Sequence, residues 1–540
     1  MKNVVFVIIY SFLIFKGNSA TSSYDYSSYG STSTNTNLSG QTISSTTSGE
    51  SAVYITNSGI TISDSTIQKS GDISDSQKED SEFYGINAAV LVQGGGVTIK
   101  DGSITTSATG GNAVCATNNG AVTISGTKIT STGSSSARGL HATYGGTITA
   151  SDVTISSSGG SCATLATDRG EGTVSCTGCT LTTEGAGSPL IYSTGDITVS
   201  GSTGTANGAQ MIVVEGKNTA TVKDSSSLKC TGVGNREVSG DKIDSCGIFL
   251  YQSMSGDADT GTSEYNCNDS TLEILSTSSV YSSAPMFFIT NTDAEINLEN
   301  CNFNYGSGTF LKAAGTSAWG TSGSNGGKVT LTLTNQDIEG DFVVDENSSL
   351  TINMVNSSIK GKINNDKVSS TVAVTLDSAS SITLTGNSYL SSLTNADTTG
   401  SNINKGSYTL ADYSGNEYTA TGTTTETNDS TSTTEANDST SDTTETNDST
   451  SYTTETNDST SDTTETNDST SDTTETNDST SDTTETNDST SDSTETTDTT
   501  NNTLSDVNTT DNDTFIRVDS ARNNLSISSF IYILFMLVLL

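Results

Sequence analysis

The sequence contains few basic, aromatic and proline residues. Among 540 residues there are 21 Lys or Arg, 2 Pro, 1 Trp and 1 His, and aromatic residues make up 6% of the chain. Against 62 acidic residues this leaves a net charge of −41. The shortage of Lys and Arg argues against nucleic acid as a partner, because phosphates are bound by positive charge. The single histidine leaves the eight cysteines without the ligand that usually supports a zinc site, and no cofactor is expected.

No apolar run is long enough to span a bilayer, which takes ~20 residues in a helix. The first run follows Lys2 and extends from Val4 to Phe15, and small or polar residues then lead to Ala20. This order of charged, apolar and small segments predicts a secretory signal peptide over residues 1–20. A secreted chain reaches an oxidising environment, where its cysteines can pair.

The last apolar run covers residues 530–540 and follows a polar spacer, and three small residues beginning at Asp519 precede that spacer. A small triplet, a spacer and a short apolar tail are typical of a GPI attachment signal, here from 519 to 540. We expect the lipid at Asp519 or Ser520, with Asn523 and Asn524 as alternatives. The predicted location is the extracellular face of the plasma membrane or the cell wall, and the lipid is the predicted contact with the membrane.

Acidic residues are concentrated near the C-terminal end. Residues 421–520 hold 25 acidic residues and one basic residue, which account for 24 of the 41 net negative charges. A decapeptide Ser-Asp-Thr-Thr-Glu-Thr-Asn-Asp-Ser-Thr recurs there with small variations. Such a segment cannot offset its conformational entropy with a core, so we expect a disordered, O-glycosylated stalk over residues 419–518. The candidate N-glycosylation sites are Asn428, Asn437, Asn447, Asn457, Asn467, Asn477 and Asn487 in the stalk, and Asn268, Asn347 and Asn356 before it.

Residues 50–418 contain a repeat with a period near 25 residues, after a polar Ser/Thr-rich segment over residues 21–49. Alternating triplets such as Val97-Thr98-Ile99 recur along the chain. In the first four of them, a second apolar residue lies seven positions after the first residue of the triplet. Three short strands per period indicate coils that bury their inner side only by stacking. The sequence therefore predicts an all-β fold, a right-handed parallel β-helix without helices. The triplets begin at Val97, Val122, Ile148, Val174, Ile197 and Ala220, the second positions are Ile104, Ile129, Ile155 and Leu181, and the third elements begin at Cys115, His141, Leu165 and Ile191.

The repeat is interrupted once, and we expect an insertion near residues 231–270. Later coils are expected at Leu272, Ile296, Val329, Leu350 and Val372, the last three with a shorter period. The coils resemble the β-helix repeats of pectin-lyase-like and adhesin-like surface proteins, and residues 382–397 are similar to the closing coils of large bacterial adhesin-like proteins. This resemblance implies a surface or adhesive role and no particular ligand.

The motifs of β-helix enzymes are mostly missing. Of the polygalacturonase set, only Asn291-Thr292-Asp293 occurs, without Asp-Asp or Gly-His-Gly. His141, the only histidine, is interpreted as a variable residue of the repeat. We therefore predict a non-catalytic surface protein that contacts glycans or surface proteins, with a polysaccharide-active enzyme as the alternative. A groove that gathers three or more carboxylates with a basic residue would favour the enzyme.

Cysteines, threonines and the tryptophan leave further alternatives open. The outward threonines of the triplets form a row that high β-propensity explains as well as a binding role does. Trp319 is a candidate for stacking on a sugar ring or for closing the core. Cys176 and Cys179 have redox spacing, but core packing or a structural disulfide is favoured. The candidate pairings are Cys115 or Cys162 with the Cys176/Cys179 pair, and Cys230, Cys246, Cys267 and Cys301 among themselves.

Overall fold

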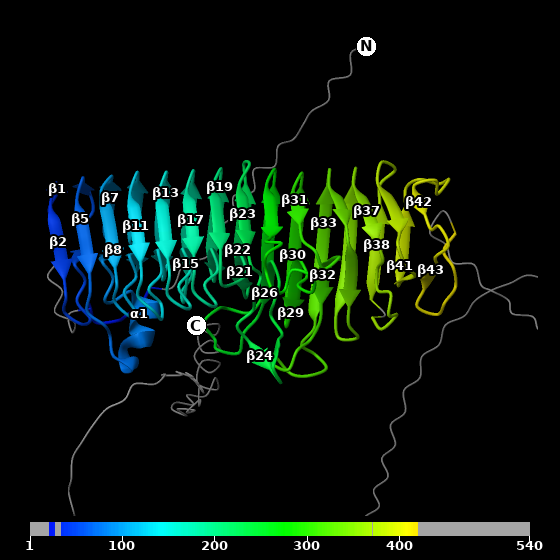
Figure 1. Ribbon diagram of the computed structural model, residues 1–540, viewed down its shortest axis with the longest axis horizontal. Helices are drawn as coiled ribbons and strands as arrows, with labels where there is room; N and C mark the ends of the chain where they lie inside the picture. The colour runs from blue at the N-terminus through cyan, green and yellow to red at the C-terminus, as the bar shows by residue number, and fades with distance from the viewer. Residues whose placement is uncertain (1–20, 27–33, 370, 420–540) are drawn as a thin grey trace, which may run out of the picture. The chain divides into compact units, whose positions relative to one another are not determined.

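The computed structural model describes residues 21–26, 34–369 and 371–419. The predicted signal peptide, residues 420–518 of the predicted stalk with the seven candidate N-glycosylation sites named above, and the GPI attachment signal lie outside the described residues. The described residues form a right-handed parallel β-helix, as the repeat predicts. Figure 1 shows the strands side by side along the solenoid.

Most coils place one strand in each of three sheets, which we call sheets A, B and C in chain order. Sheet A has fourteen strands among the described residues, each hydrogen-bonded to the equivalent strand of the next coil. They are β1 (Leu38–Ser39), β4 (Ile60–Ser63), β7 (Gly96–Lys100), β10 (Ala121–Ser125), β13 (Gly146–Ser151), β16 (Gly172–Thr177), β19 (Asp196–Ser200), β22 (Thr219–Lys223), β27 (Thr262–Asn268), β30 (Thr292–Glu299), β33 (Gly327–Thr334), β36 (Ser349–Val355), β38 (Val372–Leu376) and β41 (Ser392–Asn395).

In these coils the strand of sheet A is followed along the chain by a strand of sheet B and then by one of sheet C. Sheet B consists of β2 (Thr42–Ser45), β5 (Thr66–Lys69), β8 (Ser103–Thr106), β11 (Lys128–Ser131), β14 (Thr154–Ser157), β17 (Thr180–Thr183), β20 (Thr203–Ala206), β23 (Ser227–Cys230), β28 (Thr271–Ile274) and β31 (Asn302–Asn304). Sheet C consists of β3 (Val53–Ile55), β6 (Val90–Gln93), β9 (Val114–Thr117), β12 (Leu140–Ala142), β15 (Leu165–Thr167), β18 (Ile191–Ser193), β21 (Ile212–Glu215), β26 (Ile248–Tyr251), β29 (Phe287–Thr290), β32 (Thr309–Ala313) and β35 (Asp341–Val344).

The last coils are shorter and use two smaller parallel sheets. One contains β34 (Asp337–Glu339), β37 (Ser358–Gly361), β39 (Ser381–Leu384) and β42 (Ile403–Asn404), and the other contains β40 (Ser388–Leu390) and β43 (Leu410–Asp412). The expected closing segment, residues 382–397, lies in this region. Tyr418 is buried there and donates a hydrogen bond to the carbonyl of Leu390 over 3.1 Å, which fastens the end of the described chain to the last coils.

The register of sheet A follows the predicted triplets. Val97 pairs with Val122, Val122 with Ile148 and Ile148 with Val174. Their side chains and those of the equivalent sheet B residues are buried, so the alternation places one apolar column of each sheet in a continuous core. In sheet C the predicted alignments of Cys115 with His141 and of Leu165 with Ile191 are confirmed. The step between these pairs is wrong by one residue, because His141 pairs with Ala166 and Leu165 pairs with Leu140. The repeated Ala-Thr pair is ambiguous, and burial of leucine in the core decides the register.

Acidic and glycine residues occupy the corner between sheets A and B for a steric reason. Asp101 has φ 59° and Asp152 has φ 53°, and Gly126 takes the equivalent place in the coil between them with φ 59°. Asp tolerates this left-handed backbone better than most residues, and Gly adopts it freely. A Cβ on Gly126 would lie 2.5 Å from the Asp101 carboxylate oxygen Oδ1. Gly is therefore required at this corner position where the Asp carboxylate of the neighbouring coil occupies the space that a Cβ would need.

Four expectations about the coils need correction. Coils begin at β1, within the segment expected to be only polar, and an α-helix, α1 (Lys78–Tyr84), follows a short 3-10 turn where no helix was expected. The insertion expected near residues 231–270 is two separate loops, because β26 between them continues sheet C. The first of these loops carries the antiparallel pair β24 (Glu237–Val238) and β25 (Asp241–Lys242). Leu272 belongs to sheet B and not to the triplet of its coil, whose central apolar residue is Tyr265.

Both disulfides lie at or beside the corner between sheets A and B. Cys176 pairs with Cys179, and Cys267 pairs with Cys301 of the next coil, while Cys115, Cys162, Cys230 and Cys246 are free and buried. The expected pairing of Cys176 or Cys179 with Cys115 or Cys162 is therefore wrong. Cys115 lies in sheet C and Cys162 just before it, so neither reaches this corner.

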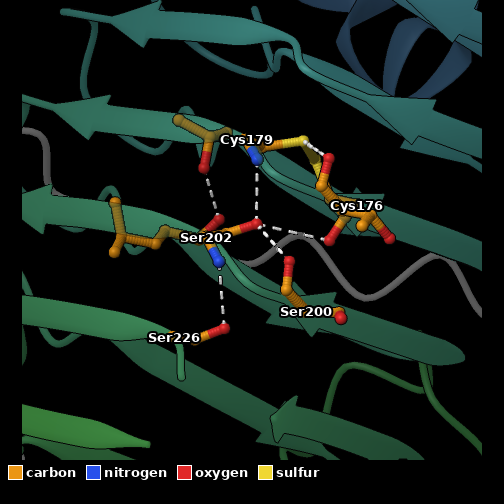
Figure 2. The surroundings of a disulfide bond; sticks show 8 residues. Cys176, Cys179, Ser200, Ser202 and Ser226 are labelled. Atoms are coloured by element: carbon orange, nitrogen blue, oxygen red, sulfur yellow. Dashed lines mark hydrogen bonds between the residues drawn. A yellow bond between two sulfur atoms is a disulfide. The ribbon is translucent and has the colours of Figure 1, made fainter. Parts of the chain in front are cut away.

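Serine side chains continue the corner next to the first disulfide. The Cys179 amide donates to the Ser202 hydroxyl over 2.9 Å, and the Ser202 amide donates to the Ser226 hydroxyl over 3.2 Å (Figure 2). The Ser202 hydroxyl in turn donates to the Ser200 carbonyl. Hydrogen bonds between successive coils thus satisfy the buried polar groups of the corner.

Candidate functional site

The outer face of sheet C is covered by other parts of the chain, unlike an ordinary solvent-facing sheet surface. Its outward column includes residues that are at most 7% exposed: Leu91, Cys115, His141, Ala166, Val213, Phe249 and Phe288. Figure 1 shows α1 and the β24–β25 loop on the same side of the solenoid. The loops after sheets B and C therefore build a second layer over this face.

A cleft of about 370 Å³ lies between these covering segments. Its residues come from α1, from sheet C, from the loops that precede β12, β15, β18, β21 and β26, and from the loops that follow β15, β26 and β32. Among those lining it, five are carboxylates, namely Glu82, Asp168, Glu215, Asp244 and Asp257, two are arginines, namely Arg138 and Arg236, and five are aromatic, namely Phe83, Tyr192, Phe249, Tyr251 and Trp319. A concave site with aromatic walls and a few polar groups is typical of small-ligand recognition.

Glu215, at the end of β21, is the most enclosed carboxylate of the cleft. Its side chain is 1% exposed. The hydroxyls of Tyr192 and Tyr251 donate to its Oε2 over 2.6 and 2.7 Å. Burial, together with the nearby Glu215 charge, raises the pKa of both tyrosines well above the ordinary value, so both keep the proton that they donate. The other oxygen, Oε1, accepts no hydrogen bond within the described residues.

A buried ion pair forms a second polar group. Arg138 Nη1 lies 3.0 Å from Asp168 Oδ2, and both residues are buried. Burial raises the pKa of Asp168 to about 7, against the opposing effect of Arg138. Asp168 is thus a carboxyl group that can bind a proton near neutral pH.

The remaining carboxylates of the cleft are held by protein groups. Asp257 lies 2.6 Å from Arg169 Nη2, and the Arg169 guanidinium carbon stands 3.7 Å from the centre of the Phe83 ring. Asp244 accepts hydrogen bonds from the backbone amides of Asn235 and Arg236. Glu82, on α1, accepts one from the Ser136 hydroxyl. These carboxylates help fix the covering loops in place.

Aromatic rings from β26 and from the loop after β32 form one wall of the cleft. The Tyr251 and Trp319 rings have centroids 5.4 Å apart in an edge-to-face arrangement, and Phe249 stacks on Tyr251 at 4.6 Å. Arg236 lies over the Trp319 ring, with its guanidinium carbon 5.7 Å from the ring centre. Trp319 is only 5% exposed, so it packs into this wall and is not a freely exposed stacking platform.

His141 contacts the ion pair but does not line the cleft. Its Nε2 lies 3.1 Å from Arg138 Nη1 and its Nδ1 lies 3.9 Å from Cys115 Sγ. Burial and the neighbouring Arg138 hold its pKa well below the ordinary value, so the ring is neutral. Burial likewise raises the pKa of Cys115 to about 12 and that of Cys162 to about 11, which keeps both thiols protonated.

The other residues singled out in the sequence lie away from the cleft. Asn291, Thr292 and Asp293 line a separate hollow, where Asp293 Oδ1 is 3.2 Å from Lys328 Nζ. Among the sequons, Asn268 ends β27 and is partly exposed, and Asn347 is partly exposed in the loop before β36. Asn356 is exposed at the corner after β36, and its Nδ2 donates to Asn335 Oδ1 over 2.8 Å.

Sequence reasoning missed the residues that form the cleft, although a signal was present. The alternation of apolar and polar residues stops in sheet C at Ile212-Val213-Val214, Ile248-Phe249-Leu250 and Phe287-Phe288-Ile289. Continuous apolar strands indicate burial on both faces. The loops that cover the outer face could be expected from this, but not which of their polar residues meet.

Comparisons with protein-family models, curated proteins and solved structures find no match to this chain. In the described part of the chain, no helix has the length and apolar character needed to cross a membrane. Residues 21–26, 34–369 and 371–419 also contain no group of three or more His, Cys, Asp or Glu side chains arranged to hold a metal ion.

Proposed function

We propose that this is a GPI-anchored cell-surface glycoprotein whose β-helix binds saccharides in the cleft over sheet C, in an adhesive, coat or matrix-contact role. The cleft supports this proposal, because aromatic side chains stand beside a buried carboxylate with a free oxygen, Glu215 Oε1. Polar groups that are fixed in place before the ligand arrives reduce the cost of binding. The resemblance of the coils to adhesin-like and pectin-lyase-like surface proteins agrees with it.

Binding of the full-length protein to a glycan array tests the proposal. The matched variant is Ser255→Trp, since Ser255 is exposed and lines the cleft, so that an indole there would obstruct entry without disturbing the core. We expect one group of glycans to bind the native protein and to lose most of that binding in the variant. Glycan binding that is unchanged by Ser255→Trp would place the site elsewhere.

A polysaccharide-active enzyme is the second candidate, and the carboxylates favour it. Hydrolysis of a glycosidic bond uses one carboxylic acid and one carboxylate. Asp168, with its pKa of about 7, would be the acid, and Glu215 would be the carboxylate. All five carboxylates, however, already have partners in the protein, Asp168 being paired with Arg138 and Glu215 accepting from two tyrosines, which is why we place binding first.

Product analysis separates the two candidates. The native protein is incubated with every glycan that it binds, and with pectin and polygalacturonate, and reducing ends are counted. Binding without new reducing ends supports the non-catalytic role. Release of product that disappears in both Asp168→Asn and Glu215→Gln would replace it with hydrolysis.

The predicted anchor is tested on intact cells. Phosphatidylinositol-specific phospholipase C should release the protein into the medium, with mock-treated cells as the control. Retention after treatment, together with failure of nitrous acid to release the protein from its lipid, would contradict a GPI anchor.

A further inference from the structure

The cleft has a surplus of negative charge that bears on its ligand. Its lining includes five carboxylates and two guanidinium groups. Arg138 neutralises Asp168, and Arg169, from just outside the lining, neutralises Asp257. Asp244 is stabilised by backbone amides rather than by a cation. No lysine is among the described residues that line the cleft.

Glu215 is the carboxylate of the cleft that has one oxygen without a hydrogen-bond partner among the described residues. Tyr192 and Tyr251 donate to Oε2 alone, and Oε1 lacks a hydrogen bond although the side chain is 1% exposed. A buried carboxylate oxygen without a hydrogen-bond donor destabilises the protein, because its desolvation is not compensated. A ligand that brings a donor to Oε1 supplies that compensation, whereas a ligand that brings a second carboxylate adds repulsion.

We propose that a bound saccharide donates a hydrogen bond to Glu215 Oε1, and that the cleft therefore takes neutral or amino-bearing saccharides in preference to uronates. This inference rests on the proposed saccharide-binding function and specifies its ligand. A hydroxyl and an ammonium group both supply the donor, so they share the chemistry that the site requires. Tyr251, the partly exposed ring of the aromatic wall, would contact the apolar face of the sugar ring, while the buried rings of Phe249 and Trp319 hold Tyr251 in place.

The first experiment compares ligands on the unmodified full-length protein. Neutral oligosaccharides (glucose, galactose, mannose and xylose polymers), chitosan oligosaccharides and oligogalacturonates of similar length are titrated by calorimetry. We expect the best neutral or amino-bearing ligand to bind at least about tenfold more tightly than any uronate, which corresponds to the loss of one good hydrogen bond or more. Uronates that bind equally well or better would overturn the inference while leaving saccharide binding intact.

The second experiment removes the charge of Glu215. Glu215→Gln keeps one oxygen acceptor but loses the charge, so binding of an amino-bearing ligand should fall by about tenfold or more, and that of a neutral ligand by less. Glu295→Gln is the matched control, because Glu295 is exposed on the outer face of sheet A. Hydrogen exchange of the sheet C amides verifies that the Glu215 variant is folded. Equal affinity of a folded Glu215→Gln and the native protein for every ligand would overturn the inference.

Three further outcomes are informative. Binding of lysine oligomers and of no saccharide would assign the site to a basic peptide and overturn both proposals. Absence of binding to any saccharide or peptide, in a protein that is folded by hydrogen exchange, would also overturn both. Saccharide binding that Ser255→Trp abolishes and Glu215→Gln leaves unchanged would preserve the proposed function and remove only the role of Glu215.

Discussion

The outer faces of sheets A and C have the same backbone arrangement and opposite chemistry. The central outward column of sheet A is mostly Thr, Ser and Asn, such as Thr123 and Thr149, which are exposed. The equivalent column of sheet C contains Phe249 and Phe288, which are covered. Stacking requires only the inner columns to be apolar, so the outer columns are free to differ. What is built over sheet C, and not the coil itself, distinguishes the two faces.

The largest expected effect is the loss of the ion pair beneath the covering loops. Arg138→Ala leaves Asp168 buried without its cation, and breaking a buried pair in this way costs about 3–5 kcal/mol. We expect faster hydrogen exchange in β12, β15 and β18, with the terminal coils unchanged, because coils interact mainly with their neighbours. The control is Lys328→Ala, which removes an exposed pair with Asp293. Equal exchange in both variants would show that the covering layer does not depend on this pair.

The next largest effect is expected at an outward position of sheet C. Phe249→Ala removes a ring that packs on Phe288 and Trp319, and we expect the free energy of unfolding to fall by about 3 kcal/mol. Local exchange in β21, β26 and β29 should rise with it. A loss below about 1 kcal/mol would mean that this face behaves as an ordinary surface.

A third test uses pH, because the layer over sheet C contains a buried carboxyl group, Asp168, whereas the described outer face of sheet A has none. The pKa of Asp168 is raised to about 7 in the folded protein, so the folded state binds a proton more tightly than the unfolded state. Its contribution favours folding most below the unfolded pKa of ~4 and is lost as pH rises through about 7. We expect the local stability of β15 to fall from pH 4 to pH 8.

The matched variant for the pH test is Asp168→Asn, in which this part of the pH dependence should disappear. Asp337→Asn, at an exposed position of β34, is the control and should leave it unchanged. A native protein whose β15 exchange, corrected for intrinsic rates, is flat over this range would contradict a raised pKa for Asp168.

The smallest effect is expected on sheet A. Thr123→Ala removes an exposed side chain from the outward row, and surface substitutions of this kind change the free energy of unfolding by less than about 0.5 kcal/mol. Saccharide binding should also be unchanged. A marked loss of binding in a triple variant of Thr98, Thr123 and Thr149 would move the ligand site to sheet A and reverse the comparison.

Much of the solenoid could be predicted, because its rule is local and repeated. Val97, Val122 and Ile148 stack as their spacing indicates, since a slip of one residue would expose a whole apolar column. The sequence places Leu165 opposite His141 because an Ala-Thr pair follows each of them. In sheet C, however, Leu165 pairs with Leu140, one residue earlier. Helix α1 was missed because it is a seven-residue insertion, stabilised by contacts such as that of Phe83 with Arg169 rather than by a long amphipathic pattern.

The period, the fold class and the apolar columns of sheets A and B follow from the amino-acid sequence alone, because side-chain alternation along a strand is enough to place them. Only the tertiary structure decided that Glu82, Asp168, Glu215, Asp244 and Asp257 line one cleft, and that Cys267 reaches Cys301. These residues are far apart in the sequence, and no local rule gives the path of the loops that carry them. Stacking of successive coils brings the loops together, and the packing of side chains such as Trp319 over sheet C fixes which charges meet.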